Sequence, residues 1–306
     1  METFSEMVPE EKHRVLICCM MALAEPPGTA GFPNPLYELG YEIDILEWDA
    51  VLNSKGEAVA PDIVLTDKKS NHSMVVECKS SELSENQIER YNNVERTDLV
   101  DWGIGSDDPR KLTHDTTLVS SYENSGTFFN TLPQWNCTFP ALQVGLVQIE
   151  KIVNEFSREE LNRIFPIRIR FEYIPQYLYP ISRESPDHVV MEQILQGLLS
   201  RLYRHESEEF EVDLKDVVID TFPHWESMGA DIRAKIMQKC QRIIAVASKD
   251  DVIGRYIEYQ YMEHQSGRIK FRIPNYRRTN AVQAFQRVGT EYIGRLRKSY
   301  VQQRLF

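Results

Sequence analysis

Two short apolar runs separated by a polar turn constrain this chain more than any other feature of its sequence. The first reads Asp-Ile-Val-Leu-Thr-Asp over residues 62–67, and the second reads Ser-Met-Val-Val-Glu-Cys-Lys over residues 73–79. Their length and β-branched content predict two strands, and the polar residues 68–72 suit a turn between them. We therefore predict a β-hairpin that carries charged residues at its open end.

The geometry of such a hairpin brings three of these charged side chains together. If the chain turns near Ser70, Asp62 lies opposite the neighbourhood of Cys78 on the second strand. Side chains alternate along a strand, so Glu77 and Lys79 point to one face and Cys78 to the other. One face of the hairpin thus collects two carboxylates and an ammonium group.

This grouping of charges suits the hydrolysis of phosphodiesters. Carboxylate oxygens at close range bind Mg²⁺ or Mn²⁺, which can polarise a phosphate and acidify a water molecule. The alternative is a plain hairpin in which Asp62 and Lys79 form a cross-strand ion pair. Three details favour the metal site: the acids adjoin strongly apolar runs, Pro61 directly precedes Asp62, and both strands are short enough to be central in a small sheet.

A family resemblance rests on these same residues. Pro61-Asp62, then fourteen residues, then Glu77-Cys78-Lys79 resembles the PD-(D/E)XK signature of restriction-endonuclease-like nucleases. Gln87 and Tyr91 extend the resemblance, because a Gln-x-x-x-Tyr motif on a helix after the lysine marks the group that includes the RecB nuclease. The iron–sulfur branch of that group uses four cysteines in an arrangement that this sequence lacks, so the resemblance is to a cluster-free relative.

The resemblance implies a role for each residue of the motif. Asp62, Glu77 and the main-chain carbonyl of Cys78 would hold the metal, and Lys79 would be the catalytic lysine. Gln87 and Tyr91 share a helix face and would position the lysine, the metal site or the nucleic-acid backbone.

Relatives also add an upstream acid to the metal site. The candidates in this sequence are Glu11, Glu38 and Glu42, of which we favour Glu38. Relatives in the RecB group often carry an upstream histidine as well, and here that residue would be His13.

The rest of the chain divides into two predicted parts. Residues 1–154 read as an α/β nuclease domain, with a mixed sheet flanked by helices as the resemblance implies. The predicted elements are helices at 9–24 and 84–94, strands at 42–52, 62–67 and 73–79, and buried segments at 117–122 and 142–149. Ser84 and Gln87 have the spacing of a capping box at the start of the second helix.

Residues 155–306 read as a mainly helical C-terminal region. A strand is predicted at 167–173, helices at 186–204, 213–221 and 229–247, and two extended runs at 255–262 and 268–273, joined by the hairpin loop 263–267. Helices followed by a basic hairpin suggest a winged helix, on element order alone.

The charge distribution points to a polyanion. The net charge is −11, and residues 1–150 hold 25 acidic and 10 basic residues, whereas residues 268–306 hold ten basic residues and one acidic residue. A basic end favours nucleic-acid binding, and a solvated basic helix is the alternative. The predicted nucleic-acid-binding residues are Arg268, Lys270, Arg272, Arg277 and Arg278.

Several classes of protein are excluded or disfavoured. The longest apolar run, residues 15–24, is about half of what a membrane span needs, and the acidic residues 1–14 do not suit a secretory signal. Five cysteines without a Cys-x-x-Cys pair indicate reduced thiols and a cytoplasmic protein. No phosphate-binding P-loop is present, so an ATPase partner would be a separate polypeptide.

We therefore expect a Mg²⁺-dependent DNA endonuclease, with Mn²⁺ as a substitute and phage restriction or another defence role as its setting. DNA is favoured over RNA, and a homodimer is compatible with the sequence. The first alternative is a non-catalytic DNA-binding regulator on a nuclease-like scaffold. The second is a subunit that binds a protein partner through amphipathic helices such as residues 186–204.

Overall fold

The computed structural model describes residues 4–27, 31–81, 83–205, 207–262, 267–273 and 278–304. The chain divides into two compact units. The first comprises Met1–Tyr179 together with Glu226–Ile232, and the second comprises Pro180–Trp225 and Arg233–Phe306. The first unit thus continues past the predicted boundary at residue 154, because the segment after it completes the sheet and packs on the first helix.

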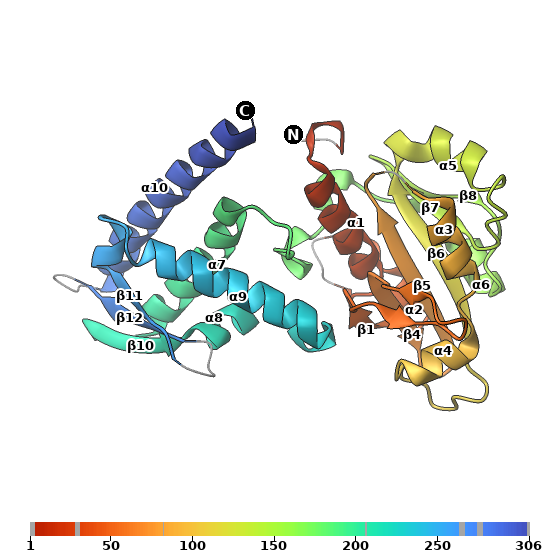
Figure 1. Ribbon diagram of the computed structural model, residues 1–306, viewed down its shortest axis with the longest axis horizontal. Coiled ribbons are helices and arrows are strands. Elements are labelled where there is room, and N and C mark those ends of the chain that lie inside the picture. The colour runs from red at the N-terminus through yellow and green to blue at the C-terminus, as the bar shows by residue number, and fades with distance from the viewer. Residues whose placement is uncertain are drawn as a thin grey trace. The chain divides into compact units, whose positions relative to one another are not determined.

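The first unit is an α/β structure built on one mixed sheet (Figure 1). Its helices are α1 (Pro9–Leu23), α2 (Pro35–Glu38), α3 (Glu85–Asn92), α4 (Arg96–Asp101), α5 (Ser125–Thr131) and α6 (Glu159–Ile164). Its large sheet is formed by β1 (Glu42–Leu46), β4 (Ile63–Asp67), β5 (His72–Lys79), β6 (Thr113–Ser121), β7 (Ala141–Val144), β8 (Gln148–Val153) and β9 (Ile167–Arg168). A separate ribbon pairs β2 (Val51–Leu52) with β3 (Ala58–Val59).

The strand directions bring the ends of several strands to one edge of this sheet. The order is β1-β4-β5-β6-β7-β8-β9, with β5, β6 and β7 parallel and β4 antiparallel to both of its neighbours. Strands β1 and β5 therefore point the same way, and their carboxyl ends lie beside the amino end of β4. The hairpin predicted from the sequence is present, with Ile63 opposite Val76 and Val64 opposite Val75.

Helices cover both faces of the sheet, as Figure 1 shows. Helix α1 is buried along its length from Arg14 to Leu23 and packs on β5 and β6. On the other face, Val64 and Val75 share a core with Ile88 and Tyr91 of α3. Alternation along each strand thus gives the hairpin two apolar faces, which explains its continuous apolar runs.

A buried polar network fastens the turn end of the hairpin. His72 lies 3.3 Å from the Asp115 carboxylate, measured from Nε2, and Tyr41 Oη lies 2.8 Å from its Nδ1. When the Tyr41 hydroxyl donates to Nδ1, the Nε2 proton of His72 faces the Asp115 carboxylate at a distance that gives electrostatic attraction. The main-chain N–H of Ser157 donates to the other oxygen of Asp115 at 2.8 Å.

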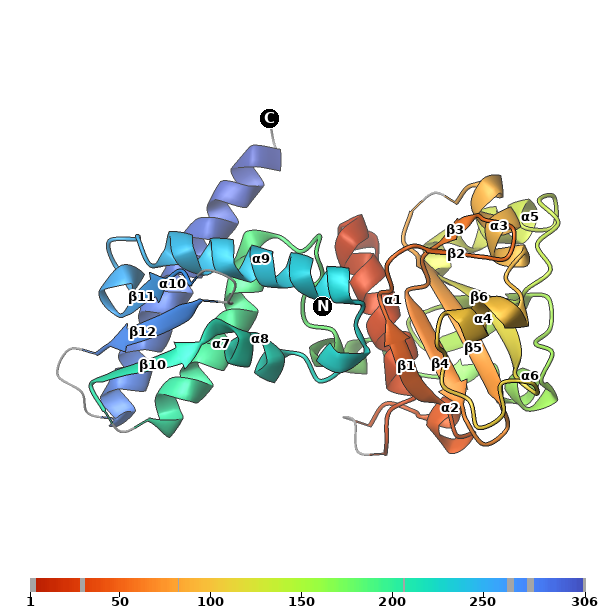
Figure 2. The same ribbon diagram turned by 60° about the horizontal axis from the view of Figure 1, so that its bottom comes forward.

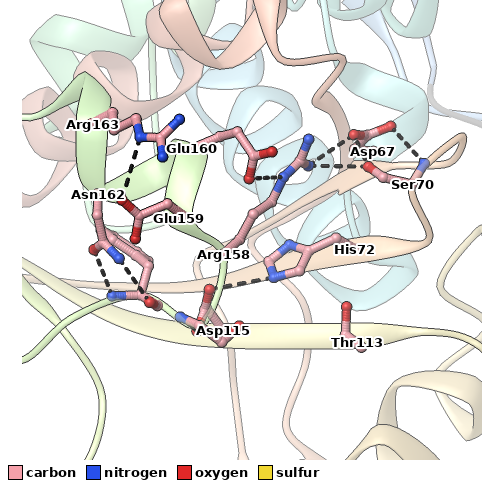
Figure 3. Close-up of polar contacts among 12 residues, drawn as sticks. Asp67, Ser70, His72, Thr113, Asp115, Arg158, Glu159, Glu160, Asn162 and Arg163 are labelled. Carbon is pink, nitrogen blue, oxygen red and sulfur yellow. Dashed lines mark hydrogen bonds and ion pairs between the residues drawn. The ribbon is translucent and has the colours of Figure 1, made fainter.

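Arg158 extends the network to the turn itself, as Figure 3 shows. Its guanidinium donates to Asp67 at 2.8 Å and to the Ser70 hydroxyl at 3.0 Å. The Arg158 guanidinium also lies over the Tyr41 ring, 5.4 Å from the ring centroid. These contacts join strands that are distant in sequence, so the network stabilises the sheet rather than one local turn.

Replacement of Tyr41 by phenylalanine tests this network. The ring stays in place while His72 loses its hydroxyl partner inside a buried site, so we expect the free energy of unfolding to fall by about 1–3 kcal/mol. Tyr177→Phe is the matched control, because the Tyr177 side chain is 54% exposed. Urea titration of both variants measures the difference, and equal stability would contradict the role given to the network.

In its described residues, the second unit combines helices with a small antiparallel sheet (Figure 2). Its helices are α7 (Asp187–Arg204), α8 (Leu214–Thr221), most of α9 (Ala230–Ala247) and α10 (Arg278–Arg304), and its strands are β10 (Glu209–Asp213), β11 (Ile257–Gln260) and β12 (Arg268–Arg272). Strand β12 lies between β10 and β11. Phe271 of β12 stacks on Phe210 and contacts Phe285 of α10, which forms the apolar side of the sheet.

The opposite side of this sheet carries three of the basic residues predicted to bind nucleic acid, and each of these three is paired. Arg268 lies 3.5 Å from Glu211, Lys270 lies 3.1 Å from Glu209, and Arg272 pairs with Glu258. The acids of β10 and β11 stand directly across the strands, so much of the positive charge is balanced locally. Arg277, the side chain of Arg278 and the loop residues 263–266 lie outside the described residues.

The structure also bears on the predicted state of the cysteines and on membrane-spanning helices. All five cysteines are buried and unpaired. Among the described residues, no helix combines the length and the apolar character needed to span a membrane.

Candidate metal centre

The candidate site lies at the edge of the large sheet where β1 and β5 end and β4 begins. Asp62 directly precedes β4, and Glu77 and Lys79 close β5. Such an edge, where the carboxyl ends of parallel strands meet, is the usual place for a site in an α/β fold. The strands β4 and β5 below it are almost wholly buried, so the polar groups stand on a rigid base.

Asp62 is fixed by the hairpin that carries it. Its main-chain N–H donates to Val76 O at 3.1 Å, and one carboxylate oxygen accepts from Cys78 N at 2.6 Å. The second oxygen lies 3.2 Å from His13 Nε2. The hairpin register thus places the carboxylate beside Cys78, as predicted from the sequence.

Glu77 is the most heavily bonded carboxylate of the site. Its side chain is 8% exposed, and Lys79 Nζ lies 2.7 Å from Oε1. Gln87 donates to the same oxygen at 2.6 Å, while the Tyr91 hydroxyl donates to Oε2. Both contacts come from α3, whose first turn is capped by Ser84, so the helix start sets where Gln87 can reach.

His13 and Glu47 complete a cluster with Asp62. One ligand atom from each residue lies within 4.8 Å of the other two. His13 comes from the second turn of α1, and Glu47 is the first residue after β1. The cluster therefore draws on a helix and two strands.

The acid that reaches the site from upstream is Glu47, which sequence reasoning did not select. The favoured candidate, Glu38, lies exposed on the short helix α2, and neither Glu11 nor Glu42 belongs to the cluster. Glu47 adopts φ of 46°, and its N–H donates to Asp62 O at 2.6 Å, so the main chain turns sharply while still paired to the hairpin. A glutamate directly after an apolar strand is the one sequence signal that could have found it.

The electrostatics of the cluster set the protonation of its members. Burial raises the pKa of Glu77 to about 7, and the negative charge of Asp62 adds to that rise, while Lys79 opposes it. Burial alone would lower the pKa of His13, but the carboxylates of Asp62, Glu47 and Glu77 raise it to about 9. At neutral pH the imidazolium of His13 thus offsets part of the carboxylate charge.

These residues fit a hard divalent cation in chemistry and in spacing. Carboxylate oxygens are the ligands that Mg²⁺ and Mn²⁺ prefer, and imidazole is a common nitrogen ligand of transition metals. The ligand atoms of His13, Glu47 and Asp62 lie within 4.8 Å of one another, close enough for one ion to reach all three after a local adjustment. His13, Glu47 and Asp62 would hold the ion, with Glu77 beside them.

Comparison with known proteins places the chain in a family. The family model for the MJECL32 domain matches residues 12–179, which contain every residue of the cluster and end where the first unit's main segment ends. The chain belongs to the MJECL32 domain family. Residues 12–179 are its MJECL32 domain, and they cover more than half of the sequence.

One relative of the MJECL32 domain gives the scale of the similarity. The Methanocaldococcus jannaschii protein that bears the name MJECL32 is 23% identical over 184 residues, which cover 55% of this chain and 40% of that protein. The chain therefore spans less than half of the length of that relative. No solved structure matches the chain.

The charge on His13 can be tested through stability. Its pKa in the folded protein, about 9, lies above the ordinary value of 6.5, so protonated His13 stabilises the fold below pH 6.5 and that contribution is lost as the pH rises through 9. In chelator, we expect the gap in unfolding free energy between wild type and His13→Gln to shrink over this range. A gap that stays constant would show that the carboxylates do not hold the proton on His13.

Proposed function

We propose that the protein is a metal-dependent nuclease that hydrolyses phosphodiester bonds. The observation that carries the proposal is the convergence of Asp62, Glu77 and Lys79 at one sheet edge, with Glu47 and His13 beside them. Three carboxylates in a confined space repel one another, and few structural roles would need all of them. The mixed sheet flanked by helices agrees with the restriction-endonuclease-like fold that the sequence resemblance implies.

Each residue has a defined part in this proposal. A divalent ion held by the carboxylates would polarise a phosphate oxygen and acidify a water molecule. The Lys79 ammonium stands 2.7 Å from Glu77, where it can orient a nucleophile and offset developing negative charge. Gln87 and Tyr91 hold Glu77 in place and leave Lys79 with one fixed partner.

DNA is the proposed substrate, and the second unit is the proposed source of attraction for it. The acidic first unit repels a polyanion, so positive charge elsewhere must offset that repulsion. The basic residues of β12 are already paired with acids. Among the described residues, Arg287 and Lys298 of α10 are exposed basic residues with no ion pair, which makes them the better candidates for phosphate contacts.

A second candidate function follows from the element order of the second unit. The order α7, β10, α8, α9, β11, β12, with β12 central in the sheet, supports a winged helix. A non-catalytic regulator would bind DNA through such a unit, and its binding would survive loss of the metal site. Filter binding or anisotropy with the Asp62→Asn variant, run beside the cleavage assay, separates this function from the nuclease.

Cleavage assays on matched variants test the nuclease directly. Supercoiled plasmid, linear duplex, single-stranded DNA and RNA are incubated with Mg²⁺ or Mn²⁺, and we expect cleavage of DNA by the wild type. Asp62→Asn keeps an acceptor for Cys78 N but loses the charge, and Lys79→Ala removes the ammonium, so each should slow cleavage by about 100-fold or more.

The control for these variants is Lys69→Ala, which removes an exposed lysine in the turn of the same hairpin. It should cleave at the wild-type rate, and urea titration should show that all three variants remain folded. Equal rates in the wild type, Asp62→Asn and Lys79→Ala would reject the site.

A further inference from the structure

The first unit is not contiguous in sequence, and its added piece lies beside the candidate site. Residues Glu226–Ile232 belong to the first unit although they are encoded within the C-terminal half of the chain. Met228 forms a parallel β-bridge with Leu46, the last residue of β1 and the neighbour of Glu47. The segment therefore pairs with the chain where that chain delivers Glu47 to the metal cluster.

Two further contacts tie this segment to the residues around Glu47. A Cβ atom built on Gly229 would stand 3.2 Å from Glu47 O and 3.3 Å from Asp49 N, so the two main chains are packed without spare room. The N–H of Asp231 donates to the Asp49 carboxylate at 3.1 Å. Residues 228–231 thus contact the main chain on both sides of Glu47.

Glu47 has a particular need for such support. Its φ of 46° lies in the left-handed region, which costs energy for a residue with a side chain and persists only where neighbours enforce it. On one side, Asp62 O accepts from Glu47 N. On the other side, Trp48 N donates to Pro61 O at 3.1 Å, and the bridge segment Met228–Asp231 packs against the same stretch of main chain.

We infer that Met228–Asp231 is a positioning element of the metal centre, supplied by the C-terminal half of the chain. It fixes the main chain at Glu47 and thereby aims the Glu47 carboxylate at Asp62 and His13. The inference rests on the proposed metal site. It adds that the functional unit is larger than the MJECL32 domain at residues 12–179, because part of its support comes from residues far beyond Tyr179.

The same segment is continuous with the core of the second unit. Helix α9 begins at Ala230 and runs to Ala247, and its later turns bury Cys240, Ile243 and Ile244. The segment Met228–Asp231 therefore runs directly into α9 without an intervening loop.

Substitutions at Gly229 in the full chain test the inference. The φ of Gly229 lies outside the left-handed region, so added side-chain atoms test packing alone. Gly229→Val should weaken Mn²⁺ binding about 10-fold or more, as loss of support around a metal ligand typically does. Gly229→Ala should weaken it less. Gly126→Val is the matched control, because a Cβ at Gly126 has no neighbour within 4 Å.

Mn²⁺ affinity is measured by calorimetry, and the fold of each variant is checked by urea titration in chelator. Saturating Mn²⁺ should restore cleavage by Gly229→Val towards the wild-type rate, which a general loss of structure would not allow. If both Gly229 variants fail to fold, Asp49→Ala, which deletes the acceptor of Asp231 N–H without adding bulk, takes their place and should also weaken Mn²⁺ binding.

Two negative results have different meanings. Wild-type Mn²⁺ affinity in folded Gly229 variants would overturn the positioning role and leave the metal site intact. No Mn²⁺ binding by the wild type, or equal binding by the wild type and Asp62→Asn, would reject the metal site and this inference with it.

Discussion

Repulsion among carboxylates at one sheet edge is the constraint on which the rest of this structure depends. Asp62, Glu77 and Glu47 are brought together where the chain could have kept them apart, and each is held by a different device. Main-chain donation from Cys78 holds Asp62, α3 and Lys79 hold Glu77, and a strained turn holds Glu47. Because the like charges cost free energy, the surrounding fold must supply it through apolar burial and cross-strand pairing.

The two ends of the β4–β5 hairpin differ in how their charged groups are balanced. At the turn end, Tyr41, His72 and Asp115 form a buried network in which each group has a partner of suitable charge or polarity. At the open end, the acids outnumber the nearby cations. The network at the turn end can hold the register of the strands although the acids at the open end repel one another. The register matters because a slip of one residue would turn Asp62 away from the site.

The sequence predicted the parts of the structure that depend on local pattern. Helix α1, the hairpin, α3 with its Ser84 cap, and α7, α8 and α9 lie within a few residues of their predicted positions. The prediction that Asp62, Glu77 and Lys79 lie together rested on strand alternation and on an assumed turn near Ser70, and the register differs from that assumption by one residue. The run at 142–149 proved to be two strands, β7 and β8, because residues 145–147 form a turn that an apolar pattern does not reveal.

Long-range contacts could not be predicted in the same way. The sequence does not distinguish between the upstream glutamates Glu38, Glu42 and Glu47. The left-handed turn after β1 decides which of them reaches Asp62. The ion pairs that neutralise Arg268, Lys270 and Arg272 depend on β10, a strand whose Glu209 and Glu211 gave no apolar signal. Helix α10 corresponds to the alternative of a basic helix for the C-terminal residues, whose bounds the charge pattern alone did not fix.

The division of the first unit in sequence bears on when the cluster of acids can be complete. A site assembled from residues 12–179 alone would be complete as soon as that part of the chain folded. Because Met228–Asp231 contacts the main chain on both sides of Glu47, that main chain has its full support only when the start of α9 is in place. An ion bound at the proposed site would then stabilise the finished chain more than residues 12–179 alone.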